Sequence, residues 1–166
     1  MFSLHELLAS GGIGLADPET GQPADADTLY SICSISKLFT SIAVMQGRDA
    51  GNLRLDDELG EYVPWFETLT DAHPDDEPIT IRRVLTHSAG LPRESDSPYW
   101  APDFDFPTTE QIRERLPSQQ TLYPSGRYFQ YSNLGMALLG EVVAAQAERP
   151  WSAVIQEDIL APLGMG

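Results

Sequence analysis

Residues 34–45 are SISKLFTSIAVM, a serine and a lysine that lead into an apolar run. Lys37 is the only lysine of the chain, and the other basic side chains are arginines or histidines. The apolar run predicts a helix that starts at Lys37 and ends near Gly51. The residues expected to face the interior are Leu38, Ile42, Val44 and Met45. Ser34 is therefore predicted to lie at the start of a largely buried helix.

Ser34 and Lys37 are three residues apart, a spacing at which two side chains share one face of a helix. A desolvated lysine can lose its proton and act as a base, which an arginine cannot do. A serine becomes a good nucleophile when a neighbouring base takes its proton, and a helix start favours developing negative charge. The pair therefore indicates an activated nucleophile, although S-x-x-K is a short pattern that also arises by chance.

The composition limits the classes of function. The chain has 166 residues, a net charge of −15 and a pI near 4.3, so binding to nucleic acid or to an anionic membrane is not expected. No run of about 18 apolar residues is present, and the N-terminus lacks the basic and apolar segments of a signal peptide. The single cysteine, Cys33, is expected to be a small buried residue rather than a nucleophile.

The rest of the chain is predicted to be rich in helix and poor in strand. A strand is expected over residues 7–16, followed by a turn at 17–21, and an extended segment over 28–32. Helices or helical turns are expected over residues 53–62, 80–86, 109–116, 133–147 and 150–160. One strand without a partner cannot satisfy its backbone groups, so the chain is expected to be part of a larger domain.

Residues 93–108 are expected to form a long loop without helical or strand periodicity. The loop carries the aromatic side chains Tyr99, Trp100, Phe104 and Phe106. Two interpretations are open. The aromatic side chains line a substrate pocket, or they anchor the loop to the core as a hydrophobic plug.

A second polar cluster, Tyr131-Ser132-Asn133, follows roughly a hundred residues after the first and opens an apolar segment. S-x-x-K followed by Y-x-N resembles the serine β-lactamase and penicillin-binding-protein superfamily, especially its branch of class C β-lactamases, carboxylesterases and D-aminopeptidases. Residues 14–17 (GLAD), 85–92 (LTHSAGLP) and 162–165 (PLGM) are also similar to this branch. The resemblance implies an α/β (α+β) fold of the β-lactamase/transpeptidase type, of which this chain holds mainly the helical region.

The resemblance also implies roles for four residues. Ser34 matches the acylated nucleophile, Lys37 the base, Tyr131 a second proton-transfer group, and Asn133 an amide that orients Lys37 and binds the substrate. A tyrosine near a cation can have a lowered pKa, and an amide can donate and accept hydrogen bonds. The alternatives are structural, with Tyr131 as an aromatic packed at the helix entry and Asn133 as a helix cap.

The three histidines are expected to have no direct chemical role. His87 lies in the LTHSAGLP segment and is expected to support the site rather than to complete a Ser-His triad. His5 and His73 form no metal-ligand pattern. Neither a metal nor a cofactor is therefore expected.

The chain also departs from the family pattern. The superfamily carries a third motif, K-T-G, H-x-G or a similar tripeptide, on a strand that faces the serine, and no such tripeptide occurs here. The family's first strand is expected to be missing or shortened at Met1. Residues 1–166 are therefore expected to be a partial β-lactamase-related domain without the C-terminal strands. Its uncovered apolar surface would favour self-association.

The expected function is that of a serine hydrolase that forms an acyl-enzyme with a small-molecule substrate. The substrate is an ester, a β-lactam or a D-amino-acid peptide, and the isolated chain is expected to be inactive because the third motif supplies an oxyanion donor. Two alternatives stay open. One is a non-catalytic penicillin-sensing or scaffold member of the same fold, and the other is a truncated gene product without activity.

Overall fold

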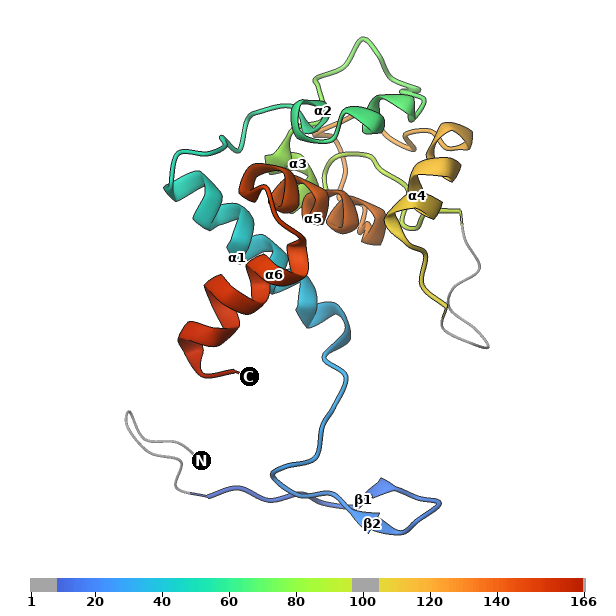
Figure 1. The fold of residues 1–166 in the computed structure, drawn as a ribbon. Helices are drawn as coiled ribbons and strands as arrows, with labels where there is room; N and C mark the ends of the chain where they lie inside the picture. Colours follow the sequence, from blue (N-terminus) through green and yellow to red (C-terminus); the bar gives the residue numbers. More distant parts are fainter. Residues whose placement is uncertain (1–8, 97–104, 166) are drawn as a thin grey trace. The chain divides into compact units, whose positions relative to one another are not determined.

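The computed structural model describes residues 9–96 and 105–165. The chain divides into two compact units, one up to Cys33 and one from Ser34 onward. The first unit contains an antiparallel hairpin of β1 (Leu15–Asp17) and β2 (Gln22–Pro23) (Figure 1). The sequence predicts a strand over residues 7–16. In the described part of the chain the strand is shorter, and it pairs with β2 across the turn. Residues 28–32 contain no strand.

The turn of this hairpin is closed by Asp17. Its carboxylate accepts hydrogen bonds from the Thr20 hydroxyl at 2.8 Å and from the backbone N–H of Glu19 at 2.8 Å. These bonds, the Thr20 hydroxyl first, lower the pKa of Asp17. An Asx-type turn of this kind explains why a strand direction reverses here without a long loop.

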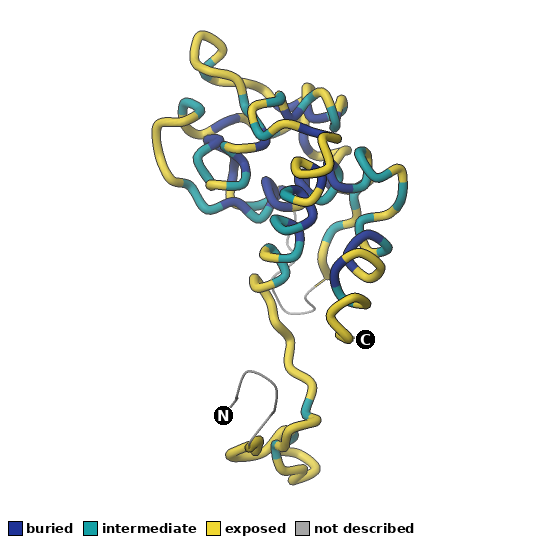
Figure 2. The backbone as a smooth tube through the Cα atoms, turned by 90° about the vertical axis from the view of Figure 1, so that its left-hand side faces the viewer, coloured by how far each residue is buried: buried dark blue, intermediate teal, exposed yellow. Residues whose placement is uncertain are grey.

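The second unit is built around the helix α5 (Asn133–Ala147), whose bounds match the sequence prediction. Its apolar residues face several neighbours at once, and those below 3% exposure include Leu134, Leu138, Leu139, Val142 and Val143. The helix packs against α1 (Ser36–Asp49), α2 (Leu59–Tyr62), α3 (Ile81–Leu85) and α6 (Trp151–Ile155). A helix that is apolar on nearly all sides is stable only when other elements cover it. Figure 2 shows that the buried residues gather in this helical unit.

The α1 helix differs in one respect from the sequence prediction. It ends at Asp49, and Gly51 follows with a φ of 79°, as expected for a helix stop. Val44 is fully buried and Ile42 is partly buried, but Leu38 is 58% exposed rather than inside. Leu38 directly follows Lys37 in the first turn of α1.

The remaining helices are short. The helix α4 (Thr109–Arg115) begins at Thr108, whose hydroxyl accepts the N–H of Gln111. Short 3₁₀ segments cover Pro64–Thr68 and Leu116–Ser118. The helix predicted over residues 150–160 is instead α6, a π-helical turn over Gln156–Leu160 and a 3₁₀ turn over Ala161–Leu163.

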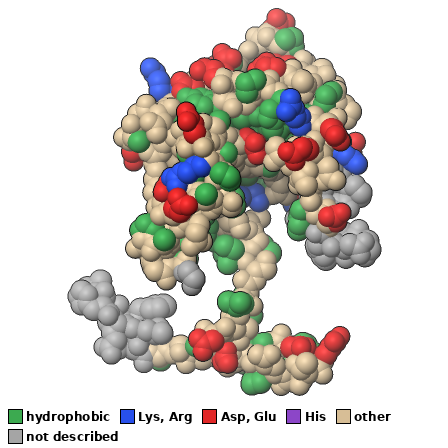
Figure 3. All heavy atoms as spheres, viewed as in Figure 1, with side chains coloured by type: hydrophobic (Ala, Val, Ile, Leu, Met, Phe, Trp, Pro, Cys, Tyr) green, Lys and Arg blue, Asp and Glu red, His purple; other side chains and the backbone are tan. Residues whose placement is uncertain are grey.

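The surface shows many acidic side chains and few basic ones over the helical unit (Figure 3). In the described residues, no helix is long and apolar enough to cross a membrane. Within the same residues, no group of three or more His, Cys, Asp and Glu side chains is arranged to hold a metal ion. The prediction that Cys33 is buried is wrong, because its side chain is exposed. Its φ of 46° turns the chain just before Ser34.

Candidate active site

Ser34 lies in a 3₁₀ turn, Cys33–Ile35, that leads directly into α1. Lys37 Nζ donates a hydrogen bond to Ser34 Oγ at 3.1 Å, from the first turn of α1. Tyr131 Oη, from the segment before α5, donates to the same oxygen at 2.9 Å. The structure therefore brings three of the four predicted site residues together on one hydroxyl oxygen.

This arrangement can activate a serine. The side chain of Ser34 is exposed, and those of Lys37 and Tyr131 are half-buried, so a ligand can approach the hydroxyl. An amine or a phenolate at hydrogen-bond distance can take the serine proton when it is in its basic form. Two such groups on one oxygen allow a proton to be taken by one group and delivered by the other.

The ring of Tyr131 is surrounded by basic side chains. Lys37 Nζ lies 5.1 Å and Arg93 Cζ 5.2 Å from the ring centre, and the His87 ring centre lies at 4.6 Å. Burial alone would raise the pKa of Tyr131. Hydrogen bonds with Lys37 and Ser34, and the charges of Lys37 and Arg93, act against this effect of burial. The net result is a lowered pKa of Tyr131. The lowered pKa makes the phenolate form of Tyr131 easier to reach beside Ser34 Oγ than in a free tyrosine.

His87 contacts the segment that carries Tyr131, and among the described residues the hydrogen bond of its side chain is made with that segment rather than with Ser34. Its Nδ1 accepts the backbone N–H of Ser132 at 3.2 Å, and its carbonyl accepts the N–H of Gln130 at 2.7 Å. Burial, followed by the charge of Lys37, lowers the pKa of His87. A neutral imidazole is the form that can accept the Ser132 hydrogen bond.

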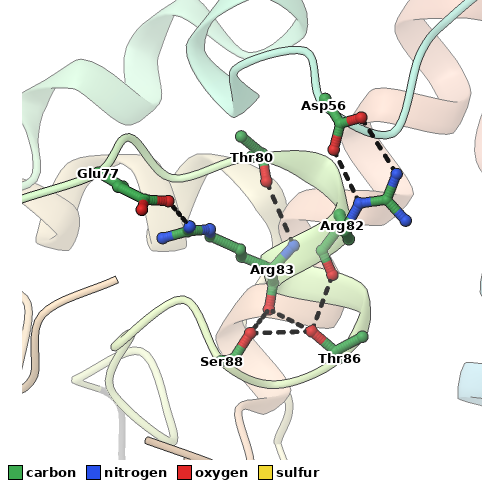
Figure 4. A network of polar contacts seen from close by, with 7 residues as sticks. All are labelled: Asp56, Glu77, Thr80, Arg82, Arg83, Thr86 and Ser88. Carbon is green, nitrogen blue, oxygen red and sulfur yellow. Dashed lines mark hydrogen bonds and ion pairs between the residues drawn. The ribbon is translucent and has the colours of Figure 1, made fainter. Parts of the chain in front are cut away.

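The turn that presents His87 is held by a polar network around α3. His87 has a φ of 55°, and its neighbours Thr86 and Ser88 join their hydroxyls at 2.9 Å across it. The Thr86 hydroxyl also donates to the Arg82 carbonyl at 3.0 Å, and the Ser88 N–H donates to the Arg83 carbonyl at 2.8 Å. Figure 4 shows the hydroxyl contacts of Thr86 and Ser88, together with the Thr80 cap of α3 and the ion pairs Arg82–Asp56 and Arg83–Glu77.

The segment after His87 lies beside the segment that leads to Tyr131. The Ser88 carbonyl accepts the N–H of Gly126 at 2.7 Å, and the Gly90 carbonyl accepts the N–H of Leu122 at 2.7 Å. Gly90 has a φ of 72°, and a Cβ at this position would lie 1.9 Å from the Tyr123 carbonyl oxygen. Only glycine fits both the conformation and the space. The LTHSAGLP segment is therefore the scaffold of the Y-x-N motif.

Ser132, the middle residue of that motif, is a site residue that sequence reasoning missed. It is 3% exposed, and its hydroxyl accepts the N–H of Gly135 at 2.8 Å as the N-cap of α5. The same hydroxyl donates to the Pro92 carbonyl at 2.6 Å. A serine directly before a long apolar run is the signal that could have revealed this cap.

Asn133 is the first residue of α5, and the cap of that helix is Ser132. Its amide nitrogen donates to Glu94 Oε1 at 2.7 Å, and its backbone N–H donates to the Arg93 carbonyl at 2.7 Å. The Asn133 side chain is half-buried, and the residue follows Tyr131 by two positions. Among the described residues, the Asn133 side chain hydrogen-bonds to Glu94, and no hydrogen bond joins it to Lys37.

The aromatic loop predicted to line a pocket is only partly described. Tyr99, Trp100 and Phe104 lie outside the described residues. Phe106 is 58% exposed. The two interpretations of the loop, as a pocket or as a plug, both stay predictions.

Comparison with known proteins agrees with the motifs and the fold. The family model described as Beta-lactamase matches residues 5–166. The chain belongs to the beta-lactamase family. Over 164 residues it is 36% identical to Beta-lactamase-like protein 2 of Dictyostelium discoideum, and over 179 aligned positions it is 32% identical to Esterase EstB of Burkholderia gladioli.

The fold is also that of the family. A crystal structure of a β-lactamase/D-alanine carboxypeptidase from Yersinia pestis, complexed with citrate, matches with a TM-score of 0.79 at 28% identity. The match covers 94% of this chain and 46% of that one. The matches to Beta-lactamase-like protein 2 and to Esterase EstB each cover 96% of this chain. They cover only 30% and 43% of those proteins. The β-lactamase/transpeptidase-type fold and the predominance of helices are thus confirmed. The extent of the domain stays a prediction.

Proposed function

We propose that the chain carries the nucleophilic part of a serine hydrolase that works through an acyl-enzyme. The observation that supports this proposal best is the position of Ser34 Oγ, 3.1 Å from Lys37 Nζ and 2.9 Å from Tyr131 Oη. A serine in a merely structural role has no need of two groups that can take its proton. Its exposure leaves room for a carbonyl substrate.

The proposed reaction begins with attack of Ser34 Oγ on the carbonyl carbon. The serine proton passes to the basic member of the Lys37–Tyr131 pair, and the carbonyl oxygen becomes an oxyanion. The proton then passes to the leaving group as the bond to the carbonyl carbon breaks. Water, deprotonated by the same pair, attacks the acyl-enzyme and releases the acid. The lowered pKa of Tyr131 makes its phenolate, the form that can accept a proton, easier to reach than in a free tyrosine.

The proposed substrate class is an ester, a β-lactam or a D-amino-acid peptide. An esterase and a β-lactamase/D-alanine carboxypeptidase among the similar proteins support this range. Asn133 is proposed to contact the bound substrate through its amide, since it follows Tyr131 by two residues at the start of α5. No cofactor takes part in this scheme.

We further propose that the 166 residues alone do not turn over substrate. The backbone N–H of Ser34, in the 3₁₀ turn before α1, is the proposed oxyanion donor, and the third motif of the family, which provides another, is not in the sequence. Loss of one oxyanion donor costs roughly a hundred- to a thousandfold in rate. Hydrolysis of nitrocefin or p-nitrophenyl butyrate should therefore be below detection.

The test is covalent labelling, which needs one reaction per molecule rather than turnover. The purified protein is incubated with a fluorophosphonate, and the adduct is located by peptide mass spectrometry. We expect a slow adduct on Ser34 that is absent in Ser34→Ala. An adduct of equal yield in Ser34→Ala would refute the proposal. A stable penicillin adduct at Ser34 would instead support the sensor alternative.

A further inference from the structure

The residues Arg93 and Glu94 follow the LTHSAGLP segment and contact both functional members of the Y-x-N motif. Arg93 Cζ lies 5.2 Å from the centre of the Tyr131 ring, within the range of a cation–π interaction. Glu94 Oε1 accepts the amide N–H of Asn133 at 2.7 Å. The two charged side chains are joined to each other by an ion pair of 3.2 Å.

The backbone of this dipeptide is fixed to α5. The Arg93 carbonyl accepts the N–H of Asn133 at 2.7 Å and that of Leu134 at 3.2 Å. These two donors belong to the first turn of α5, where N–H groups have no partner within the helix. The Glu94 carbonyl accepts the side-chain amide of Gln119 at 3.0 Å. The dipeptide is therefore held in place independently of its two charged side chains.

We propose that Arg93 and Glu94 are positioning residues of this site, Arg93 by placing a positive charge on the Tyr131 ring and Glu94 by orienting the Asn133 amide. The inference rests on the proposed function, because it concerns the same serine site. Arg93 would favour the phenolate of Tyr131, the form in which this second proton-transfer group can accept a proton within the Lys37–Tyr131 pair. Glu94 would direct the amide nitrogen of Asn133 and leave its oxygen to face a bound substrate.

Charged or titratable side chains approach Tyr131 and its neighbours from three segments of the chain. Lys37 approaches from α1, His87 from the turn after α3, and Arg93 with Glu94 from the following segment. His87 has a lowered pKa and is neutral near pH 7. The charges that lower the pKa of Tyr131 are therefore those of Lys37 and Arg93, and Glu94 pairs with Arg93. The Arg93 side chain is 60% exposed, so salt weakens its effect.

Arg93 is tested by titration of Tyr131 in the purified protein, with tyrosine carrying ¹³C at Cζ and with Tyr131→Phe to assign the signal. Arg93→Gln should raise the pKa of Tyr131 by about half a unit, the size expected for a solvated charge at this distance. Arg93→Lys should keep most of the wild-type value. Arg113→Gln, an exposed change on α4 with the same loss of charge, should leave it unchanged. A wild-type pKa in Arg93→Gln would overturn the role of Arg93.

Glu94 is tested by the side-chain NH₂ signals of Asn133, assigned with Asn133→Asp. Glu94→Gln keeps an oxygen acceptor and should retain slow hydrogen exchange of this amide. Glu94→Ala removes the acceptor and should speed the exchange at least about threefold. Thermal melts followed by circular dichroism check that each variant is folded. Equal exchange in Glu94→Ala and in the wild type would overturn the role of Glu94.

These measurements need no substrate, so the two proposals can fail separately. Absence of a Ser34 adduct would refute the proposed function and leave the titration result unaffected. A Ser34 adduct together with an unchanged Tyr131 titration in Arg93→Gln would refute only the inference made here.

Discussion

The two halves of the site are built in different ways. Ser34 and Lys37 are three residues apart, and one turn of the chain is enough to place Lys37 Nζ 3.1 Å from Ser34 Oγ. Tyr131 and Asn133 reach the site only because residues 87–94 hold them through hydrogen bonds to Ser132 and Gln130 and to Asn133 itself. A change in the first half should thus affect chemistry without affecting stability. A change in the scaffold of the second half should affect both.

The largest effect is expected in the local half. Lys37→Arg keeps the charge but removes the base, so fluorophosphonate labelling of Ser34 should slow by at least about a hundredfold, nearly as much as in Ser34→Ala. The melting temperature should stay within about two degrees of the wild type, because neither side chain is part of the core. The measurement is the labelling rate by intact mass, beside a calorimetric melt. A labelling rate above a tenth of wild type would show that Lys37 is not the base.

The scaffold of the second half is tested by a matched pair of glycines. Gly90 and Gly51 both have a positive φ, but a Cβ meets the Tyr123 carbonyl at 1.9 Å only at Gly90. Gly51→Ala should lower the free energy of unfolding by about 1–2 kcal/mol from the left-handed conformation alone. Gly90→Ala should cost about 3 kcal/mol or more, because the clash adds to it. Urea unfolding measures both, and equal losses would mean that the close approach of the two segments is not required.

Loss of the Ser132 cap of α5 should lower the free energy of unfolding by less than the change at Gly90. Ser132 belongs to the scaffold of the second half of the site. Ser132→Ala removes the bond to Gly135 and leaves the Pro92 carbonyl without its donor. The expected loss in the free energy of unfolding is about 2 kcal/mol. Thr108→Ala, which removes an exposed cap of α4, is the control and should cost about 1 kcal/mol. If the two variants lose the same stability in urea, the buried bond to Pro92 contributes nothing.

The smallest effect concerns the protonation of His87. Its pKa is lowered in the folded protein, so the unfolded chain binds more protons once the pH falls below about 6.5. Stability should therefore be full above this pH and should decrease as the pH falls from about 6.5 toward the folded pKa. His87→Asn suits the left-handed backbone and removes the titration, so its urea midpoint should fall less between pH 7.5 and 5.5. The same pH dependence in both proteins would contradict this assignment.

The sequence was sufficient where a signal is local and repeated. The bounds of α5 follow from a long apolar run, and the stop of α1 follows from Gly51. The pairing of β1 could not be predicted, because β2 has only two residues and one of them is proline. The π-helical turn at Gln156–Leu160 has no sequence signal. In the structure, two of its residues, Glu157 and Asp158, form ion pairs with Arg149.

The same distinction applies to the site. Spacing alone predicted the contact of Ser34 with Lys37, and the resemblance added Tyr131. The hydrogen bond of Asn133 with Glu94 joins residues 39 positions apart, and Glu94 lies in a segment without periodicity. Leu38 and Cys33 were expected to be buried from their residue type, but burial depends on which neighbours cover them, and in this structure both are exposed.

The exposure of Cys33 has a practical consequence. It is the only thiol of the chain, it is exposed, and it is the residue directly before Ser34. A maleimide fluorophore or a nitroxide attached there would sit at one defined position beside Ser34. Its emission or mobility would report each arrival of a ligand at Ser34, whether or not a reaction follows. The protein therefore carries a natural attachment point for an optical sensor of its own site.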